Sequence, residues 1–309
     1  QQENRDESRQ VESEDRPTQP GDTLTFGDLA LLSTGPNGTP VTHPMLAVVK
    51  ADVDHLGLLF AYGLGSRVSL GRLATLSRGI DEFFKGFMTK QLKESFPHLY
   101  TVYAGGDDLL LVGPWYDAIH FVRQLHQWFE QFTCKNPEVT LSAGVTLSQP
   151  RSPISRSAQA SSDALDRSKD AGRNRITIGP LTLTWPEFDE AIRIHNTMWL
   201  ARANPDASVS MGLNASILYR LLQYARMARQ VTHEDSTGGT EAIPLTHSKW
   251  RSQMKYDLRR NLAIPEQPHN DREHAIVDLH RDLMSITSER AAVLELASMI
   301  TLYCLRGAE

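Results

Sequence analysis

The stretch that decides the fold is Leu99-Tyr-Thr-Val-Tyr-Ala-Gly-Gly-Asp-Asp-Leu-Leu-Leu-Val-Gly113. Two short apolar runs, rich in residues that favour β-strands, flank Gly105-Gly106-Asp107-Asp108, and this pattern predicts a hairpin with a glycine turn. Glycine lets the backbone turn tightly and lets a bulky group approach it, so the two carboxylates at the tip would be accessible to a metal ion and a phosphate. The same residues are good turn formers, which leaves a purely structural role open.

A second pair of acids ends the apolar run Leu46-Ala-Val-Val-Lys-Ala-Asp52-Val-Asp54. Residues two apart on a strand point to the same face, so both carboxylates are expected on one face of a sheet. Four converging carboxylates repel one another unless a divalent cation neutralises them, which predicts that these four aspartates hold Mg²⁺ or Mn²⁺. This layout is that of palm-type nucleotidyl transferases, in which metal ions activate an attacking hydroxyl and hold a triphosphate.

Composition limits the class of molecule. The 309 residues are 40% hydrophobic and 22% charged, with a net charge of −5, which allows one large core or two smaller ones. No apolar run approaches the ~20 residues that cross a bilayer, so we expect a cytoplasmic protein without a membrane partner. Cys134 and Cys304 lie far apart, which supports neither a disulfide framework nor a structural zinc cluster.

The order of the periodic segments predicts two domains after a tail. Residues 1–22 are polar and acidic and are expected to form a disordered tail or linker. Residues 23–184 have the βαββαβ order of a ferredoxin-like α+β fold, with an antiparallel sheet covered by helices on one face. Residues 185–309 are expected to form an α-helical bundle. Helices are predicted at residues 69–92, 115–132, 155–171, 213–229, 249–262 and 285–305, and strands at residues 24–32, 46–54, 99–104, 109–113, 139–146 and 176–178.

A group of cations follows the third of these helices. Lys169, Arg173 and Arg175 stand where the helix ends and a strand returns to the sheet. Cations beside an acidic metal site would bind a triphosphate. Residues of this kind also complement a helix C-terminus, for which Gly172 would be the cap. The phosphate role is favoured most for Lys169.

Basic and aromatic residues alternate along two helices of the predicted bundle. They could face RNA or an RNA-binding subunit. Charges of this kind more often form a solvated face, and the pattern alone favours that interpretation. The residues are Arg220, Arg226, Arg229, Lys249, Arg251, Lys255, Arg259 and Arg260, with Tyr219, Tyr224, Trp250 and Tyr256 between them.

Taken in order, the motifs resemble a known family. The segments 48–57, Leu76-Ser-Arg78, Val102–Leu109 and Leu141-Ser-Ala-Gly144 are similar to the second Palm domain of the large subunit of type III CRISPR–Cas effector complexes, most like the Csm (III-A) branch. The segment Ala164–Asn174 also resembles diguanylate cyclases of the GGDEF class, which are similar in fold. The helical residues 185–309 are similar in position to the C-terminal bundle of that subunit.

The resemblance implies an ATP-consuming nucleotidyl cyclase, which makes cyclic oligoadenylates when target RNA pairs with the CRISPR RNA. It implies that metal-activated 3′-hydroxyl groups attack α-phosphates. The residues it assigns are Asp107 and Asp108 with Asp52 and Asp54 for the metal ions, Gly105 and Gly106 against the nucleotide, Lys169 and Arg173 for phosphates, and Ser77 for the nucleoside.

The resemblance also implies partners. These are other type III effector subunits, CRISPR RNA and target RNA within the complex, and a first Palm half with an HD domain, in cis or in trans. Because family members bind two ATP molecules between two Palm domains, an isolated monomer is expected to be inactive.

Two alternatives remain open at this point. One is a catalytically silent structural subunit of the same complex, and the other is a diguanylate-cyclase-like enzyme that consumes GTP. Gly-Gly-Asp-Asp stands where diguanylate cyclases usually have an acid followed by Glu-Phe, which favours the CRISPR assignment.

Overall fold

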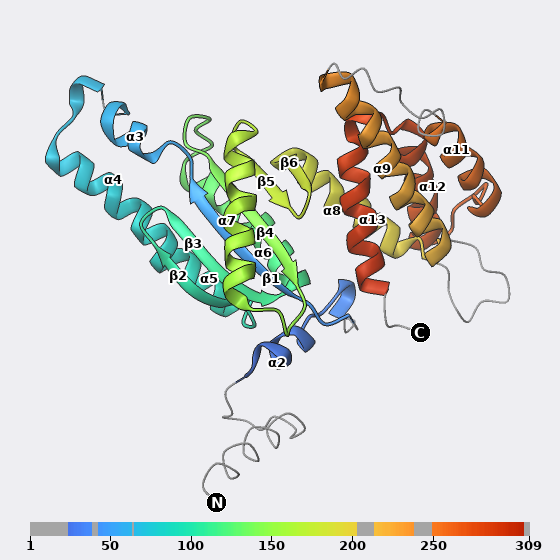
Figure 1. Ribbon diagram of the computed structural model, residues 1–309, viewed down its shortest axis with the longest axis horizontal. Helices are drawn as coiled ribbons and strands as arrows, with labels where there is room; N and C mark the ends of the chain where they lie inside the picture. Colours follow the sequence, from blue (N-terminus) through green and yellow to red (C-terminus); the bar gives the residue numbers. More distant parts are fainter. Residues whose placement is uncertain (1–23, 39–42, 64, 203–212, 238–248, 306–309) are drawn as a thin grey trace, which may run out of the picture.

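The computed structural model describes residues 24–38, 43–63, 65–202, 213–237 and 249–305. The sheet and the helices that cover it lie beside a second group of helices, which come mostly from the last third of the chain (Figure 1). The predicted tail at residues 1–22 lies outside the described residues. No helix in the described ranges is long and apolar enough to span a bilayer.

Six strands form one sheet in the order β2-β3-β1-β4-β5-β6. The first four in sequence, with the helices between them, have the predicted βαββαβ arrangement of a ferredoxin-like fold. All neighbouring strands are antiparallel except β4 and β5, which are parallel because α7 crosses over between them. The strands are β1 (Leu46–Val53), β2 (Tyr100–Gly105), β3 (Asp108–Pro114), β4 (Leu141–Ser148), β5 (Arg175–Ile178) and β6 (Leu181–Thr184).

The helices cover most of the predicted positions and add others. α6 occupies the predicted range, and the long helix expected at residues 69–92 is α4, a π-helical segment η4 and α5 in succession. The helices are α2 (Phe26–Leu31), α3 (Leu56–Tyr62), α4 (Leu70–Glu82), η4 (Phe83–Phe87), α5 (Met88–Ser95), α6 (Trp115–Phe132), α7 (Ile154–Asp170), α8 (Trp185–Leu200), α9 (Ala215–Thr237), α11 (Trp250–Asn261), α12 (Asp271–Ser285) and α13 (Ala291–Leu305).

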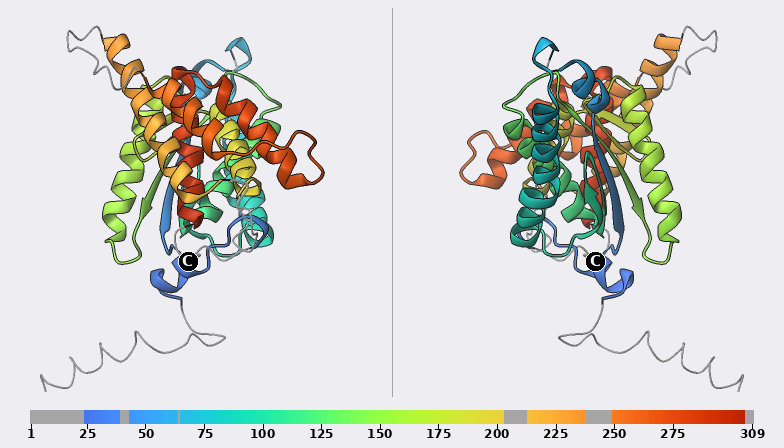
Figure 2. Two further views of the ribbon diagram at one scale, coloured as in Figure 1. Left: turned by 90° about the vertical axis from the view of Figure 1, so that its right-hand side faces the viewer. Right: turned by 90° about the vertical axis from the view of Figure 1, so that its left-hand side faces the viewer.

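Two predictions about the architecture are wrong. The expected strand at residues 24–32 is helix α2, because Thr25 and Asp28 form a capping box that satisfies the backbone N–H groups at its start. The sheet carries helices on both faces rather than one, with α7 on the side opposite α4 and α6 (Figure 2).

Strand β1 explains why both faces are covered. Ala47, Val49, Ala51 and Val53 belong to the large core that includes α6, whereas Leu46 and Val48 belong to a smaller core that includes α2 residues and side chains of α7. A strand that is apolar on both sides must be buried on both sides. The polar residues near its end therefore emerge next to α7. The division of the chain at residue 184 stays a prediction, although β6 ends and α8 begins there.

Gly144 sets the distance between α7 and the sheet. A Cβ atom at Gly144 would lie 2.3 Å from the Leu165 backbone nitrogen and 2.3 Å from the Ser161 carbonyl oxygen, both in α7. Since the obstructing atoms are backbone, Gly144→Ala is expected to push the helix outward and to lower the free energy of unfolding by ~1–3 kcal/mol. Chemical denaturation measures this change.

Gly71 provides the matched control for that substitution. It lies in α4, and a Cβ there would meet no atom within 4 Å. Gly71→Ala should raise stability slightly, by up to about 1 kcal/mol. Equal effects of the two substitutions would contradict the close approach at Gly144.

Candidate functional site: two strand-end carboxylates beside a glycine turn

The glycine hairpin has the predicted geometry. Gly105 pairs with Asp108 across the end of β2 and β3, which leaves Gly106 and Asp107 as a two-residue turn. Gly106 has φ of 64° while Asp107 keeps a negative φ, and positive φ at the first central residue alone is the pattern of a type II′ turn. The Asp107 carbonyl accepts a hydrogen bond from the Val53 N–H at 3.0 Å, which ties the hairpin to β1.

Asp52 and Asp108 lie directly opposite each other. They are register partners on the antiparallel strands β1 and β3, so their side chains leave the same face of the sheet with Cβ atoms roughly 5 Å apart. The alternation of β1 assigns this face to the side of α7. The predicted meeting of acids from two separate segments is therefore present for this pair.

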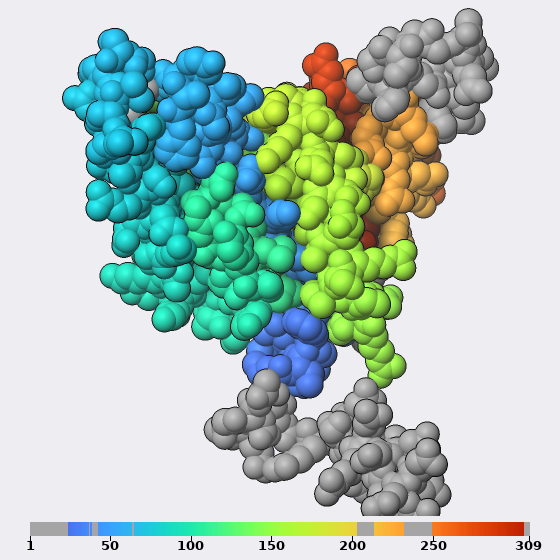
Figure 3. All heavy atoms as spheres, turned by 60° about the vertical axis from the view of Figure 1, so that its left-hand side comes forward, coloured from blue at the N-terminus to red at the C-terminus, as the bar shows by residue number. Residues whose placement is uncertain are grey.

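Burial raises the pKa of the Asp52 carboxyl above its ordinary value. Hydrogen bonding and charge from Lys169 act in the opposite direction, and the negative charges of Asp107 and Asp108 raise the pKa further. A carboxylate that is half-buried beside two like charges favours the arrival of a cation. Figure 3 shows β1 atoms exposed between the hairpin region and α7, so this side of the sheet is open to a ligand.

Lys169 supplies the positive charge that the pair has in this structure. It forms an ion pair with Asp52 from the last turn of α7. The adjacent Ser168 fixes the helix there, because its hydroxyl donates to the Ala143 carbonyl at 2.8 Å and contacts Thr177 Oγ1 at 2.7 Å. Lys169 therefore lies at the carboxylates, as the sequence predicted.

Asp54 does not join the carboxylate pair. It is buried, with 2% of its surface exposed, and its oxygens accept hydrogen bonds from Thr140 Oγ1 at 2.8 Å, Ser142 Oγ at 2.7 Å and the Asn174 N–H at 3.0 Å. Asp54 thus lies apart from the Asp52–Asp108 pair, and its predicted metal-binding role stays a prediction. Its hydrogen bonds connect the end of β1 to the β4 region and to the loop after α7.

That loop carries Arg173. Gly172 has φ of 115° and Arg173 has φ of 60°, and the Arg173 N–H donates to the Ser168 carbonyl at 3.1 Å. The next residue is the one that Asp54 binds, so Asp54 positions the backbone on which the Arg173 side chain stands. Arg173 has no ion-pair partner among the residues that the structure describes.

The aspartates that lie close together are too few to enclose a divalent cation by themselves. Among the described residues, no three Asp, Glu, His or Cys side chains are grouped closely enough to hold a metal ion. Mg²⁺ usually binds through one or two carboxylates, water and substrate phosphates rather than through a complete protein cage. Asp52 and Asp108, with Asp107 next in the turn, meet that requirement, whereas the predicted four-aspartate set does not form.

Asp81 and Lys85 contact the turn, and the sequence reasoning did not identify them. The Gly106 N–H donates to Asp81 Oδ1 at 3.0 Å, and Lys85 Nζ lies 2.7 Å from the same oxygen. The sequence shows an acid and a lysine four residues apart in a predicted helix. Their contact with the hairpin could not be predicted, because it depends on how the helix packs against the rest of the fold. Ser77 is exposed one turn earlier on α4.

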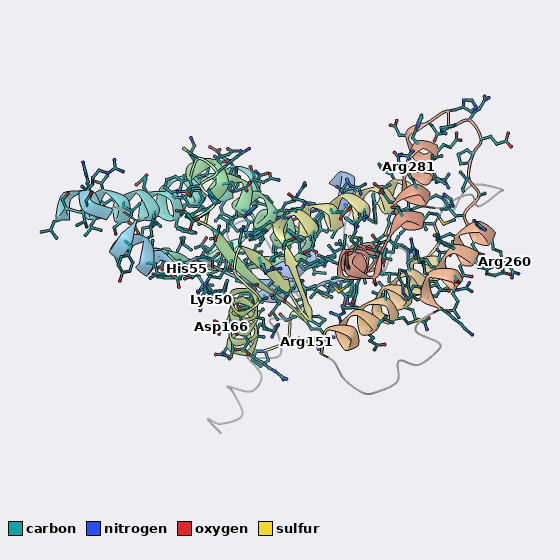
Figure 4. The ribbon with its side chains drawn as sticks, turned by 90° about the horizontal axis from the view of Figure 1, so that it is seen from above. Lys50, His55, Arg151, Asp166, Arg260 and Arg281 are labelled. Carbon is teal, nitrogen blue, oxygen red and sulfur yellow. The ribbon has the colours of Figure 1, made fainter. Side chains whose placement is uncertain are left out.

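The predicted basic stripes of the bundle differ from each other. On α9, Arg220 pairs with Asp257 at 3.0 Å, and Arg226 and Arg229 pair with Glu295 at 3.1 and 3.2 Å. The α9 stripe is thus largely neutralised within the bundle. On α11, Arg251, Arg259 and Arg260 are exposed and Lys255 is half-buried. Figure 4 places Arg260 at the outer side of the bundle, away from Lys50 of β1 and His55 after it.

The comparisons with known proteins agree with this fold. Residues 45–177 match the family model described as Cas10/Cmr2, second palm domain. The chain is 34% identical over 201 residues to a Cas10/Csm1 protein (subtype III-A) of Thermococcus onnurineus, described as a CRISPR system single-strand-specific deoxyribonuclease, covering 57% of this chain and 24% of that protein. It therefore spans about a quarter of the length of this relative.

Solved structures extend the likeness to the helical part. The crystal structure of Csm1 in T. onnurineus superposes with a TM-score of 0.66 at 24% identity and covers 93% of this chain and 41% of that one. A Csm1–Csm4 cassette in complex with cA4 superposes with a TM-score of 0.65 at 24% identity and covers 94% of this chain and 39% of that one. These values establish a shared fold.

Proposed function

We propose that this chain, whose residues 45–177 match the model of the Cas10/Cmr2 second palm domain, is the nucleotide-cyclising part of a type III-A effector subunit. It would convert ATP to cyclic oligoadenylates when the complex binds target RNA. The observation that carries the proposal is the Asp52–Asp108 pair opposite each other, with Lys169 beside it and a glycine turn next to it. The cA4 found with a related Csm1–Csm4 cassette supports adenylate as the product class.

The proposed roles of the residues rest on where their side chains lie. Asp52 and Asp108 would hold a divalent cation, Mg²⁺ or Mn²⁺, with Asp107 beside them in the turn. Such an ion lowers the pKa of a hydroxyl and neutralises charge on phosphates. At Gly106 a Cβ would meet no atom within 4 Å, so a nucleotide could lie against the turn there, whereas the space beside Gly105, the other predicted nucleotide contact, is taken by Lys85. Asp54 has no place in this set, since its oxygens are already occupied.

Lys169 and Arg173 are the proposed phosphate contacts. Lys169 is paired with Asp52 in this structure, and its ammonium would move to the triphosphate when a cation takes its place at the carboxylates. Each step forms a bond between a 3′-oxygen and an α-phosphorus and breaks the bond to pyrophosphate. Arg173 would stabilise the charge on the departing pyrophosphate, and Ser77 remains the candidate contact for the nucleoside.

The partners are part of the proposal. A Csm4-like subunit is proposed because the related cassette pairs Csm1 with Csm4. A first Palm half with an HD domain would complete the nucleotide site from the other side. CRISPR RNA and target RNA would act through the assembled complex, and the exposed Arg251, Arg259 and Arg260 of α11 form a surface that suits a polyanion.

The proposal is tested by following nucleotide consumption. The chain is expected to be inactive as an isolated monomer, and to release cyclic oligoadenylate and pyrophosphate from ATP when combined with a first Palm half, effector subunits, Mg²⁺ and target RNA. Chromatography of the products, with and without target RNA, measures this. GTP supplied alone is the substrate control.

Two outcomes would favour the alternatives. Assembly of the complex without any ATP turnover would indicate a silent structural subunit, and turnover of GTP in place of ATP would indicate a diguanylate-cyclase-like enzyme. Cyclisation of ATP by the purified monomer would contradict the need for a partner Palm.

A further inference from the structure

The tip of the hairpin is held by a helix that lies 25 residues earlier in the sequence. The Gly106 N–H donates to Asp81 Oδ1, and Lys85 lies on the same carboxylate oxygen. Asp81 belongs to the last turn of α4, and Lys85 to the π-helical segment that follows it. Nothing in the proposed chemistry uses either residue, so their contact with the turn needs its own explanation.

An aromatic cluster fixes the rotation of this helix. Ile80, Phe83 and Phe84 are buried, and the Phe83 ring packs edge-on against Phe129 of α6 with centroids 5.4 Å apart. Buried rings on one side of the helix leave the other side to face the hairpin. The position of Asp81 is therefore determined by the core and not by the turn that it binds.

The turn glycine makes room for this contact. A Cβ at Gly105 would lie 2.6 Å from Lys85 Cε and 3.6 Å from Asp81 Oδ1. The Lys85 ammonium lowers the pKa of Asp81, as does the Gly106 hydrogen bond, so the carboxylate stays ionised. A charged acceptor forms a stronger hydrogen bond to a backbone N–H than a neutral one.

The hairpin needs such support because of where it lies. β2 is the edge strand of the sheet and has β3 as its single neighbour. Its register with β3 shifts between Thr101 and Tyr103, and such irregularities disrupt the ladder locally. The Val53–Asp107 hydrogen bond holds the tip to β1 on the β3 side, but on the β2 side the tip has only this short and interrupted ladder and the contact from Asp81.

We infer that Asp81 is the positioning residue of the hairpin. By holding the Gly106 N–H it fixes the turn that presents Asp107 and Asp108 opposite Asp52, and so sets the affinity of the carboxylates for a divalent cation with a nucleotide. This inference rests on the proposed function. Asp81 itself contacts neither the cation nor the nucleotide.

The experiment compares three variants of the chain, each combined with a first Palm half because the proposed nucleotide site lies between the two. Asp81→Ala removes the acceptor, Asp81→Asn keeps an oxygen acceptor without charge, and Lys85→Met keeps the Asp81–Gly106 contact. Two quantities are measured: Mn²⁺ affinity by electron paramagnetic resonance with a non-hydrolysable ATP analogue, and hydrogen–deuterium exchange of the hairpin peptide. Circular dichroism verifies that each variant is folded.

Asp81→Ala is expected to speed exchange in the hairpin and to weaken Mn²⁺–nucleotide binding roughly three- to tenfold, the worth of one hydrogen bond. Asp81→Asn should recover most of both, and Lys85→Met should leave hairpin exchange near that of the unmodified chain. Asp81→Ala with unchanged affinity, or Asp81→Asn as weak as Asp81→Ala, would overturn the positioning role.

Asp108→Ala separates this inference from the proposed function. If Asp108→Ala abolishes Mn²⁺–nucleotide binding while Asp81→Ala leaves it intact, only the positioning role fails. If the unmodified chain and Asp108→Ala bind Mn²⁺–nucleotide equally, or neither binds it, the proposed function fails and the inference fails with it.

Discussion

Asp108→Asn is expected to give a chain that is more stable than the unmodified one in the absence of metal and that is inactive in the assembled complex. Asp108 faces Asp52 across the β1–β3 ladder, and like charges at directly opposite positions destabilise a sheet by up to ~1 kcal/mol. Burial adds to this cost, as the raised pKa of Asp52 indicates. Removing one charge relieves the repulsion.

The same substitution removes a cation ligand. A metal ion contributes several kcal/mol of charge stabilisation to phosphoryl chemistry, so loss of a carboxylate should reduce product formation at least ~100-fold. A substitution that raises stability and lowers activity indicates a residue that serves the chemistry. In a hairpin with a structural role alone, two directly opposed carboxylates would only lower stability.

Thermal unfolding with and without Mg²⁺ measures the first half of this prediction. Mg²⁺ should raise the melting temperature of the unmodified chain, because it binds the folded state, and should leave that of Asp108→Asn unchanged. Asp163→Asn is the control, since Asp163 is exposed on α7 and its carboxylate accepts a hydrogen bond from Gln159. A loss of stability in Asp108→Asn with an undiminished Mg²⁺ effect would be inconsistent with the site.

The strand alternation and the turn chemistry were sufficient to predict that Asp52 and Asp108 meet. Asp52 lies near the end of β1 and Asp108 begins β3, and their residue types and positions within each strand are local information. The hydrogen-bond partners of Asp54 could not be predicted, because they come from elsewhere: Thr140 and Ser142 from the β4 region and Asn174 from the loop after α7. The two-residue period of a strand does not continue past its last residue, and β1 ends at Val53.

The same distinction holds for the fold. The strong helical period of residues 115–132 predicted α6 with its bounds, but the apolar residues at 29–32 were taken for a strand although Thr25 and Asp28 had the spacing of a capping box. α12 was missed because charged residues separate its buried positions Ile276, Leu279 and Leu283. Its apolar side is visible only when α8 is packed against it.

Acid is expected to unfold the chain well above the pH at which carboxylates titrate. Burial lowers the pKa of His120 and His126 to about 4 and that of His195 to about 3. These values lie below the ordinary 6.5, so between pH 6.5 and 4 the unfolded chain binds protons that the folded chain does not. Stability is complete above pH 6.5 and is lost as the pH falls.

His195 links this loss of stability to the packing between helices. It is fully buried, and its ring nitrogens lie 3.1 Å from Tyr116 Oη and 2.9 Å from Thr301 Oγ1. It thereby joins α6, α8 and α13, which belong to the sheet layer and to the bundle. Protonation would place a charge in this contact, so acid should act on the packing between the two parts of the chain.

At pH 5 each of the three histidines costs roughly 2 kcal/mol of stability. Asp117 acts in the opposite direction. Burial raises its pKa to about 6, so the folded chain binds a proton there between pH 6 and 4, which adds about 1 kcal/mol of stability. The net uptake on unfolding near pH 5 is therefore about two protons.

Denaturant titrations between pH 7.5 and 5 should show the free energy of unfolding falling by several kcal/mol. His195→Gln should flatten that slope, because it removes one of the three titrating groups, whereas His269→Gln at an exposed site should not. A pH-independent free energy of unfolding across this range would mean that the histidines are not buried as neutral groups.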